Sequence, residues 1–460
     1  MNDSSPRPDA ASSTAGKFTY GSIKRHVLVM SASGAIGLIS IFAVDLLSLL
    51  YVSWLGNVNF TAGVGYATAV MFFSTSANVG MMIGVTALVS RSLGARDRER
   101  ARRQGGTSLA ISAFAALIVT LGIMSALDPI LRLLGAEGET ARVAYRFLMI
   151  AMPSNVILGI GMALSGLLRS AGDARRSMYV TLAGAIASVF LDPLFIFGFG
   201  FGTDGAAMAT ICSRIVFCLV GYHGAFRVHD LVRIPAVMEI FEDMPSLFGI
   251  ALPAVLTNLA GPAAGAFMTA VLAPYGDEAV AANAIVTRLI PVAFGSVFAL
   301  SGAIGPIIGQ NLGARNIARV RMTLTDGLSF STISIVAAWA ILALAHKEIS
   351  FIFHVSAETA DLITYFCFFI AGSWIFHGAL FVANASFNNL GAPALATAFN
   401  WGKSTIGTVP FALLGAEWYG AKGALAGQAL GAVFFGVAGV WAAYKVVDRI
   451  AKRWDKEALS

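Results

Sequence analysis

Charged side chains are scarce in this chain of 460 residues. Asp, Glu, Lys and Arg make up 12% of the sequence, whereas soluble domains contain roughly 25%. Hydrophobic residues make up 57%, and the mean hydropathy is +0.76. A soluble protein of this size would need more polar side chains to cover its surface. The composition therefore indicates a polytopic membrane protein.

Cysteine is equally scarce. The three that occur, Cys212, Cys218 and Cys367, lie in hydrophobic runs and show no CxxC spacing. A secreted, disulfide-bonded scaffold is therefore excluded. Residues 1–17 are polar and rich in Ser, Pro and Ala, which is typical of a disordered tail. No short apolar core with a cleavage site precedes the first long hydrophobic run, so we expect no cleaved signal peptide.

Motifs of catalysis and nucleotide binding are missing. The chain has no HExxH and no GxSxG, and the sequence Gly402-Lys403-Ser404 has Thr397 where an ATP-binding loop needs its first glycine. We therefore expect a protein that is not an enzyme and uses no cofactor, so that an H⁺ or Na⁺ gradient supplies its energy. The expected partners are small-molecule substrates and membrane lipids, with no nucleic acid, and the chain is expected to be a monomer.

Long hydrophobic runs account for most of the sequence. A membrane-spanning helix needs about 20 mostly apolar residues, and the chain supplies twelve such runs. They cover residues 28–55, 60–90, 105–127, 147–168, 178–199, 204–226, 246–273, 280–311, 324–346, 361–387, 393–415 and 423–444. The expected fold is an all-α membrane protein with twelve transmembrane helices.

The basic residues predict the orientation of these helices. Of the 31 Lys and Arg residues, 23 lie in the two tails and in the connections that follow even-numbered spans. Five lie in the connections that follow odd-numbered spans, and 3 lie within spans. Cytoplasmic segments carry the excess of Lys and Arg in membrane proteins. We therefore expect a multi-pass protein of the plasma (inner) membrane with both termini in the cytoplasm. The net charge of +6 is then a topology signal and does not indicate nucleic-acid binding.

The second half of the chain repeats the first with an offset of 219 residues. LGAR occurs at residues 93–96 and again at 312–315. Each half contains six spans, so the two halves enter the membrane with the same orientation, which suits a transporter built from two parallel repeats around a central cavity. The expected units are a disordered cytoplasmic tail (1–25), an N-lobe (26–226), a cytoplasmic connection (227–245), a C-lobe (246–446) and a second cytoplasmic tail (447–460). Within the connection, residues 235–248 read as an interfacial amphipathic helix.

Three segments resemble the multidrug and toxic compound extrusion (MATE) family. They are GPIIGQNLGAR (305–315), SGLLRSAGDARRSM (165–178) and FLDPLFIFGFGFGTDGAAMAT (190–210). The resemblance extends over nearly the whole chain and is closest to the DNA-damage-inducible-type branch. It implies a secondary active antiporter that exports organic, often cationic or amphipathic compounds in exchange for H⁺ or Na⁺. The alternative is a lipid-linked oligosaccharide flippase of the same superfamily, which would be expected to line its cavity with several Arg and Lys residues.

The resemblance also implies a coupling site for H⁺ or Na⁺ in the N-lobe. Asp192, Ser188 and Thr210 stand where the family has an aspartate, an asparagine and a threonine. The family's first-helix aspartate corresponds to Ser48, and the acid of this chain, Asp45, lies three residues earlier. These two changes favour proton over sodium coupling, although Na⁺ at Asp192 remains an alternative. An aspartate in the middle of a bilayer costs roughly 3 kcal/mol on insertion scales, so the residues themselves favour a functional role for both acids.

Other polar residues in the spans are candidates for the substrate cavity. Lys403 and His377 are the titratable ones, and Asn155, Asn258 and Asn384 add amides. The functional role of His377 competes with that of a histidine satisfied by its own neighbours. Pro193, Pro262 and Pro306 interrupt spans and are candidate conformational hinges.

Overall fold

The computed structural model describes residues 16–353 and 355–459, and within these ranges the chain is helical and contains no β-strand. The first half of the chain contains α1 Ile23–Ser53, α2 Val58–Gly94, α3 Arg98–Ser125, α4 Leu127–Leu133, α5 Gly138–Ala151, α6 Asn155–Ser170, α7 Ala174–Pro193 and α8 Gly202–Tyr222. The second contains α9 Val237–Leu272, α10 Asp277–Ala293, α11 Gly295–Gly313, α12 Ile317–Leu344, α13 His346–Ile352, α14 Ala357–Tyr365, α15 Trp374–Leu390, α16 Pro393–Ser404 and α17 Val409–Leu459.

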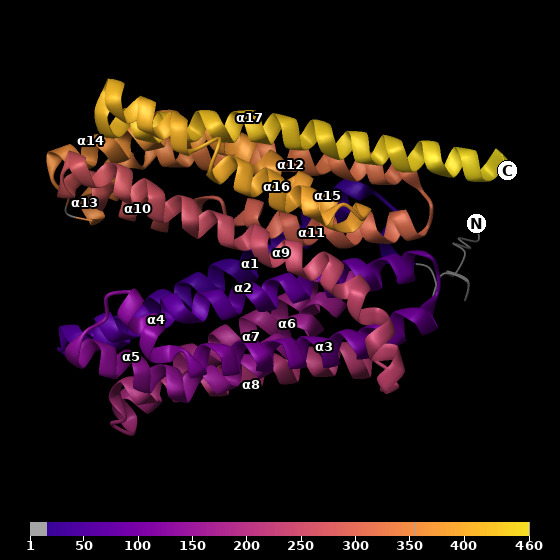
Figure 1. Ribbon diagram of the computed structural model, residues 1–460, viewed down its shortest axis with the longest axis horizontal. Coiled ribbons are helices and arrows are strands. Elements are labelled where there is room, and N and C mark those ends of the chain that lie inside the picture. The colour runs from indigo at the N-terminus through magenta and orange to yellow at the C-terminus, as the bar shows by residue number, and fades with distance from the viewer. Residues whose placement is uncertain (1–15, 354, 460) are drawn as a thin grey trace, which may run out of the picture.

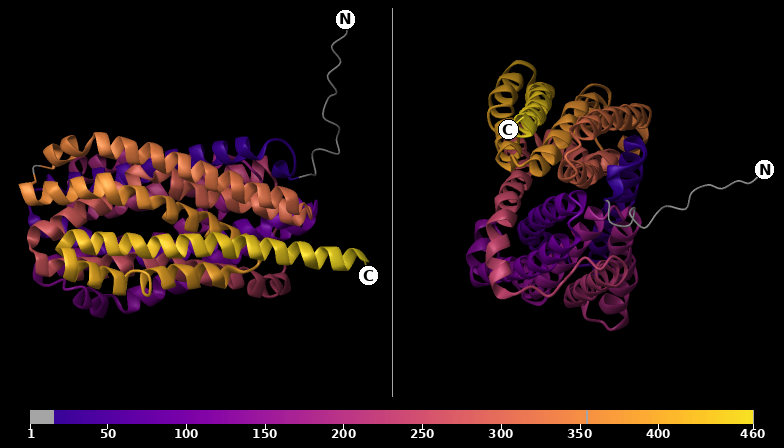
Figure 2. Two further views of the ribbon diagram at one scale, coloured as in Figure 1. Left: turned by 90° about the horizontal axis from the view of Figure 1, so that it is seen from above. Right: turned by 90° about the vertical axis from the view of Figure 1, so that its right-hand side faces the viewer.

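The two lobes lie side by side along the long axis of the molecule (Figure 1). Helices α2–α8 form one lobe and α10–α17 the other, while α9 passes from the first to the second. Figure 2 shows the helices of both lobes running roughly parallel to the same axis. Helices α1 and α2 pack against α11, and α2 also packs against α9, so the first two helices of each half form the interface between the lobes.

Twelve spans are accounted for. Ten continuous helical stretches within the described residues are long and apolar enough to cross a membrane, and α10 with α11 forms one further span with a bend of 49°. One of the ten, Pro393–Leu459, reverses direction where Tyr419 and Gly420 leave the helical conformation. Gly415 then packs on Gly423, and Gly427 packs on Phe411. This stretch is therefore a hairpin of two spans, which confirms the expected all-α fold with twelve transmembrane helices.

The LGAR repeat has the same local structure in both halves. Arg96 and Arg315 adopt positive φ angles of 61° and 53°, which end α2 and α11 in left-handed turns. The residue that follows each arginine, Asp97 or Asn316, accepts a hydrogen bond from the backbone N–H three residues later. It thereby caps the next helix. A shared stop signal and cap thus give the two halves the same helix–turn–helix geometry, at what we call the LGAR end of the molecule.

Both expected tails are partly helical. Residues 1–15 lie outside the described residues, but Lys17–Thr19 form a 3₁₀ turn and Phe18 is 1% exposed, so residues 16–25 are not a disordered tail. At the other terminus α17 continues to Leu459, because residues 445–459 supply good helix formers and no helix breaker. The connection 227–245 is helical from Val237 onward and continues into the span without a break.

The bend between α10 and α11 does not coincide with any of the expected hinge prolines. Pro262 and Pro306 are contained within the continuous helices α9 and α11. Pro193 ends α7, and a π-helical segment, Leu194–Gly198, follows it. The 49° bend falls at Phe294, three residues after Pro291, where the backbone leaves the helical region.

Candidate functional site

The N-lobe brings three ionisable side chains into one cluster. Asp45 comes from α1, Asp192 from the end of α7, and Arg214 from α8, and α7 packs against both of the other helices. Asp45 interacts electrostatically with Asp192 on one side and with Arg214 on the other. The structure therefore brings Asp45 and Asp192, which the sequence predicts to share a site, near enough to interact electrostatically.

The two carboxyl groups differ in their exposure at the protein surface. Asp192 is only 3% exposed, and the hydroxyl of Ser48 donates a hydrogen bond to its Oδ2 atom. Asp45 is exposed. Ser48 thus contacts Asp192 directly, while Asp45 lies near enough to interact with Asp192 electrostatically.

The remaining predicted members of the coupling site bond elsewhere. Ser188, one turn before Asp192, shares a hydrogen bond of 2.6 Å with Ser213. Thr210 donates to the carbonyl of Ala206 at 3.0 Å. Neither side chain bonds to Asp192 within the described residues. No group of three or more His, Cys, Asp or Glu side chains suited to a metal ion occurs in the described part of the chain.

Arg214 completes this cluster, although it is not among the site residues predicted from the sequence. Its side chain is 8% exposed, and it donates hydrogen bonds to the hydroxyl of Ser154 at 2.8 Å and the carbonyl of Ala151 at 3.3 Å. A buried charge needs such partners and a counter-charge. The only available signal was an arginine inside a hydrophobic run, which by itself does not identify the carboxylate it approaches.

The predicted polar residues of the C-lobe lie in three neighbouring helices. His377 and Asn384 belong to α15, Lys403 to α16 and Asn258 to α9. The Asn384 side chain is 7% exposed, and its Oδ1 atom has no hydrogen-bond partner among the described residues. Asn258 donates to the carbonyl of Ala254 at 3.0 Å. His377 and Lys403 are half-buried and interact electrostatically with each other.

Asn155 lies apart from these residues, inside the N-lobe. It is completely buried, accepts a hydrogen bond of 2.8 Å from Asn78, and donates one of 3.1 Å to Thr120. These bonds join α2, α3 and α6, and they leave Asn155 with no surface for a substrate in this conformation.

At the LGAR end the lobes are in tight contact. A Cβ atom at Gly94 would lie 2.0 Å from the carbonyl oxygen of Gln310, and one at Gly313 would lie 2.0 Å from that of Arg91. These four residues form two pairs separated by the 219-residue offset. Two hydrogen bonds obey the same symmetry: Arg91 donates to the carbonyl of Asn389 at 2.8 Å, and Gln310 donates to that of Ser170 at 2.6 Å.

The segment before α1 strengthens this contact. The backbone N–H of Phe18 donates to Gln310 Oε1 at 2.7 Å, and its carbonyl accepts from Arg319 at 2.8 Å. Lys17 donates to the carbonyl of Gly172 in the N-lobe at 2.9 Å. Residues 17 and 18 therefore bond to both lobes, and no sequence signal marked them because they lie in a polar stretch without periodicity.

Asp173 holds the adjacent loops together. Its carboxylate accepts from His229 Nε2 at 2.8 Å and from Arg176 Nη1 at 2.5 Å. Burial alone would raise the pKa of Asp173, but the hydrogen bonds from His229 and Arg176 outweigh it and hold the pKa well below its usual range. Asp173 is therefore ionised at neutral pH and ties the α6–α7 turn to the segment after α8.

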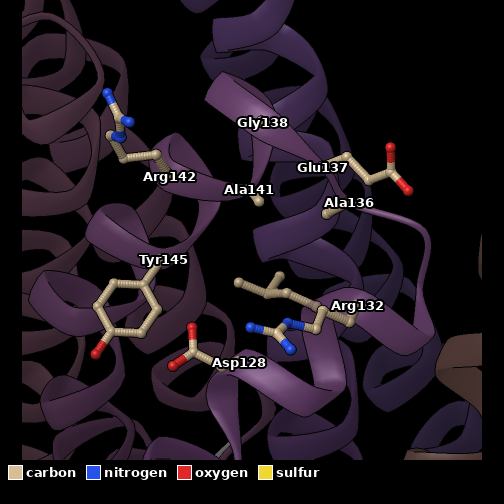
Figure 3. Close-up of a pocket in the computed structure, with 9 residues that line it drawn as sticks. Asp128, Arg132, Ala136, Glu137, Gly138, Ala141, Arg142 and Tyr145 are labelled. Carbon is tan, nitrogen blue, oxygen red and sulfur yellow. The ribbon is translucent and has the colours of Figure 1, made fainter.

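A cavity of about 540 Å³ lies at the opposite end of the N-lobe, between α4 and α5. Figure 3 shows its polar lining, Asp128, Arg132, Glu137, Arg142 and Tyr145. It contains none of the predicted site residues, and its charges are mixed in sign, so we place the candidate site at the Asp45–Asp192–Arg214 cluster.

Comparison with known proteins matches both lobes. The MatE family model matches residues 35–194 and 253–414, once in each half. A FAD transporter of Shewanella oneidensis is 27% identical over 439 residues, which cover 93% of this chain and 96% of that protein. A probable multidrug resistance protein, NorM of Thermotoga maritima, is 26% identical over 347 residues, covering 71% and 74%. The bent form of the Vibrio cholerae MATE transporter VcmN, 23% identical, matches with a TM-score of 0.88 over 95% of this chain and 99% of that chain, which shows a shared fold.

Proposed function

The chain belongs to the MatE family of membrane transporters, and we propose that it exports small organic molecules, cationic or amphipathic ones among them, in exchange for a cation that binds in the N-lobe. Relatives named as a FAD transporter and as multidrug export proteins support a small-molecule substrate. The proposed coupling ion is H⁺, with Na⁺ as the alternative.

The buried carboxyl of Asp192 is the observation that carries this proposal. It is 3% exposed within a helix long enough to span a membrane, and ionisable groups at such positions are costly and generally functional. Asp45 interacts electrostatically with Asp192. A proton that enters at Asp45 and moves to Asp192 would neutralise this pair, and two interacting carboxyls of this kind titrate as a unit.

Proton binding at Asp192 would act on a weak point of α7. Pro193 follows directly, and the next five residues are π-helical. Proline removes a helix hydrogen bond and π-segments are frequent at functional sites. Protonation would also change the bond with Ser48, because an ionised carboxylate only accepts hydrogen bonds. The proposed outcome is a different bend of α7 in the protonated state.

Efflux from cells of a pump-deficient host tests this function. Wild-type protein should lower the accumulation of a fluorescent amphipathic dye, and Asp192→Asn should abolish that effect. Asp128→Asn, which changes an exposed carboxyl at the far end of the N-lobe, is the matched control and should transport normally. Equal efflux by the Asp192→Asn and wild-type proteins would contradict the proposed role of Asp192.

We also propose that the LGAR end faces the cytoplasm. Support comes from the sequence count of basic residues, with 23 in the tails and in the connections that follow even-numbered spans and 5 in the connections that follow odd-numbered spans. In this orientation the structure is closed toward the cytoplasm. A single cysteine introduced at Arg98, in a protein without its three native cysteines, should be protected from membrane-impermeant thiol reagents in intact cells. Labelling from outside would reverse the topology.

A further inference from the structure

Three aromatic rings form a stack in the C-lobe. Phe294 and Trp374 are parallel within 4°, with centroids 4.8 Å apart. Trp374 and His377 are stacked at 4.6 Å with an interplanar angle of 14°. Phe294 is completely buried, whereas Trp374 and His377 are half-buried. The stack therefore runs from a buried end at Phe294 to a half-buried end at His377.

Lys403 adds a positive charge near the half-buried end at His377. Its charge acts on His377. The one lysine ion pair within the described residues joins Lys422 to Asp361 at 2.6 Å, so Lys403 has no such carboxylate partner there. Helices α11, α15 and α16 contain no acidic residue, and no acidic residue of α12 or α17 forms an ion pair with Lys403 within the described residues. A cation inside a spanning region without a counter-charge is costly, which points to an anion that comes from outside the chain.

Neighbouring helices of the C-lobe surround the stack on several sides. Helix α15, which carries Trp374 and His377, packs against α11, α12, α16 and α17. Several buried polar atoms of these helices have no hydrogen-bond partner within the described residues, among them Ser331 Oγ, His377 Nδ1, Asn384 Oδ1 and Ser404 Oγ. The Ser373 carbonyl lies one turn before His377, but His377 Nδ1 does not form a hydrogen bond of normal geometry with it. Groups of this kind require a partner such as a ligand or water.

From this geometry we propose that the C-lobe holds a substrate subsite for planar aromatic anions, in which the ring of the ligand stacks on His377 and its carboxylate or phosphate pairs with Lys403. The proposal rests on the proposed export function and specifies one substrate class for it. Stacking on an aromatic side chain accepts any flat ring. The ammonium group of Lys403 then selects by charge, because a charge-assisted hydrogen bond to an anion is about twice as strong as a neutral one.

The proposed subsite adjoins the bend between α10 and α11. Phe294, the buried end of the stack, is the residue at which α10 and α11 meet at 49°. A ring that settles on His377 presses on Trp374 and, through it, on Phe294. Occupation of the subsite is thereby linked to the angle between α10 and α11, while the N-lobe carboxyls remain free for the coupling cation.

Binding to purified protein tests the subsite without requiring transport. Riboflavin and FMN share the same planar ring and differ by one phosphate, and their fluorescence reports stacking. FMN should bind with higher affinity than riboflavin, and Lys403→Met should weaken FMN binding roughly tenfold or more while changing riboflavin binding by less than about twofold. Lys403→Arg should restore most of the FMN affinity. Lys347→Met, an exposed lysine in α13, is the matched control and should bind both compounds normally.

Transport into proteoliposomes then separates this subsite from the general function. Ethidium, a planar cation, is the third probe. Lys403→Met should reduce transport of FMN through a higher KM and leave ethidium transport unreduced, whereas Asp192→Asn should stop both. If the wild type transports ethidium but neither binds nor transports FMN, or if Lys403→Met affects all three probes alike, the subsite is wrong and the export function stands. Absence of ethidium transport by the wild-type protein would instead contradict the export function. Whether FMN binds to the purified protein would still test the subsite.

Discussion

Replacement of Gly94 by alanine should open the LGAR end of the molecule. The Cβ atom of an alanine there would lie 2.0 Å from the carbonyl oxygen of Gln310 in the opposite lobe. Real Cβ atoms do not approach a carbonyl oxygen so closely, and both atoms belong to helical backbone that cannot rotate away. Helices α2 and α11 must therefore separate. The conformation in which the lobes are apart at this end does not contain the clash.

The size of the effect follows from the cost of overpacking. Insertion of one methyl group into a well-packed contact typically costs about 1–3 kcal/mol. Because the cost falls on the closed conformation alone, the ratio of open to closed molecules should rise by roughly 5- to 150-fold. Gly313→Ala should have the same effect, since its Cβ atom would lie 2.0 Å from the carbonyl of Arg91 and the two positions are related by the repeat.

A reporter cysteine at Ser90 measures this opening. Ser90 is completely buried, and a Cβ atom at Gly309 of the opposite lobe would touch its hydroxyl. In a protein without native cysteines, the rate at which a thiol reagent labels Ser90→Cys should rise by the same factor as the open population. Gly122→Ala is the control, because no atom lies within 4 Å of its Cβ position. Equal labelling rates in the Gly94→Ala and Gly122→Ala proteins would refute the reasoning.

Three further predictions concern the stability of the described contacts. Phe18→Ala removes a side chain that is 1% exposed and should cost the closed state about 3–5 kcal/mol, measured as faster labelling of the reporter cysteine. Asp173→Asn should lower the melting temperature at pH 7. Because the native pKa of Asp173 is depressed, its contribution is present above the ordinary carboxyl pKa of about 4 and is lost as the pH falls below it. The difference from wild type should therefore shrink in acid, and a difference independent of pH would contradict it. Asn78→Ala should reduce the free energy of unfolding by about 1–3 kcal/mol, because it leaves Asn155 Oδ1 without the bond from Asn78; an unchanged melting temperature would contradict the network.

Much of the fold could be predicted because its determinants are local. The twelve hydrophobic runs and the LGAR repeat are written in consecutive residues, and each has a direct structural counterpart. The ends and bends of the helices were harder to predict from the sequence. The hydropathy pattern did not reveal that residues 445–459 extend α17, because most of these residues are polar. The sequence also did not reveal that the span containing Pro291 bends at Phe294, because a proline alone does not determine where a helix bends.

The candidate site was only partly predictable because its contacts join distant segments. Resemblance identified Asp192, and the shift of the first-helix acid to Asp45 was visible in the sequence. The bond from Ser48 to Asp192 depends on how α1 is rotated against α7, and the approach of Arg214 to Asp45 depends on α8. Such relations between helices leave no local pattern. Phe18 was missed for the same reason, since a lone aromatic residue in a polar stretch shows no periodicity.

Efflux from proteoliposomes under imposed gradients tests the coupling mechanism most directly. Purified protein should move a fluorescent organic substrate when a pH gradient is imposed without sodium, and Asp192→Asn should abolish this transport. A sodium gradient at equal pH on both sides should drive little or no movement. Transport driven only by sodium, or pH-driven transport that is undiminished in the Asp192→Asn protein, would contradict proton coupling through the N-lobe carboxyls.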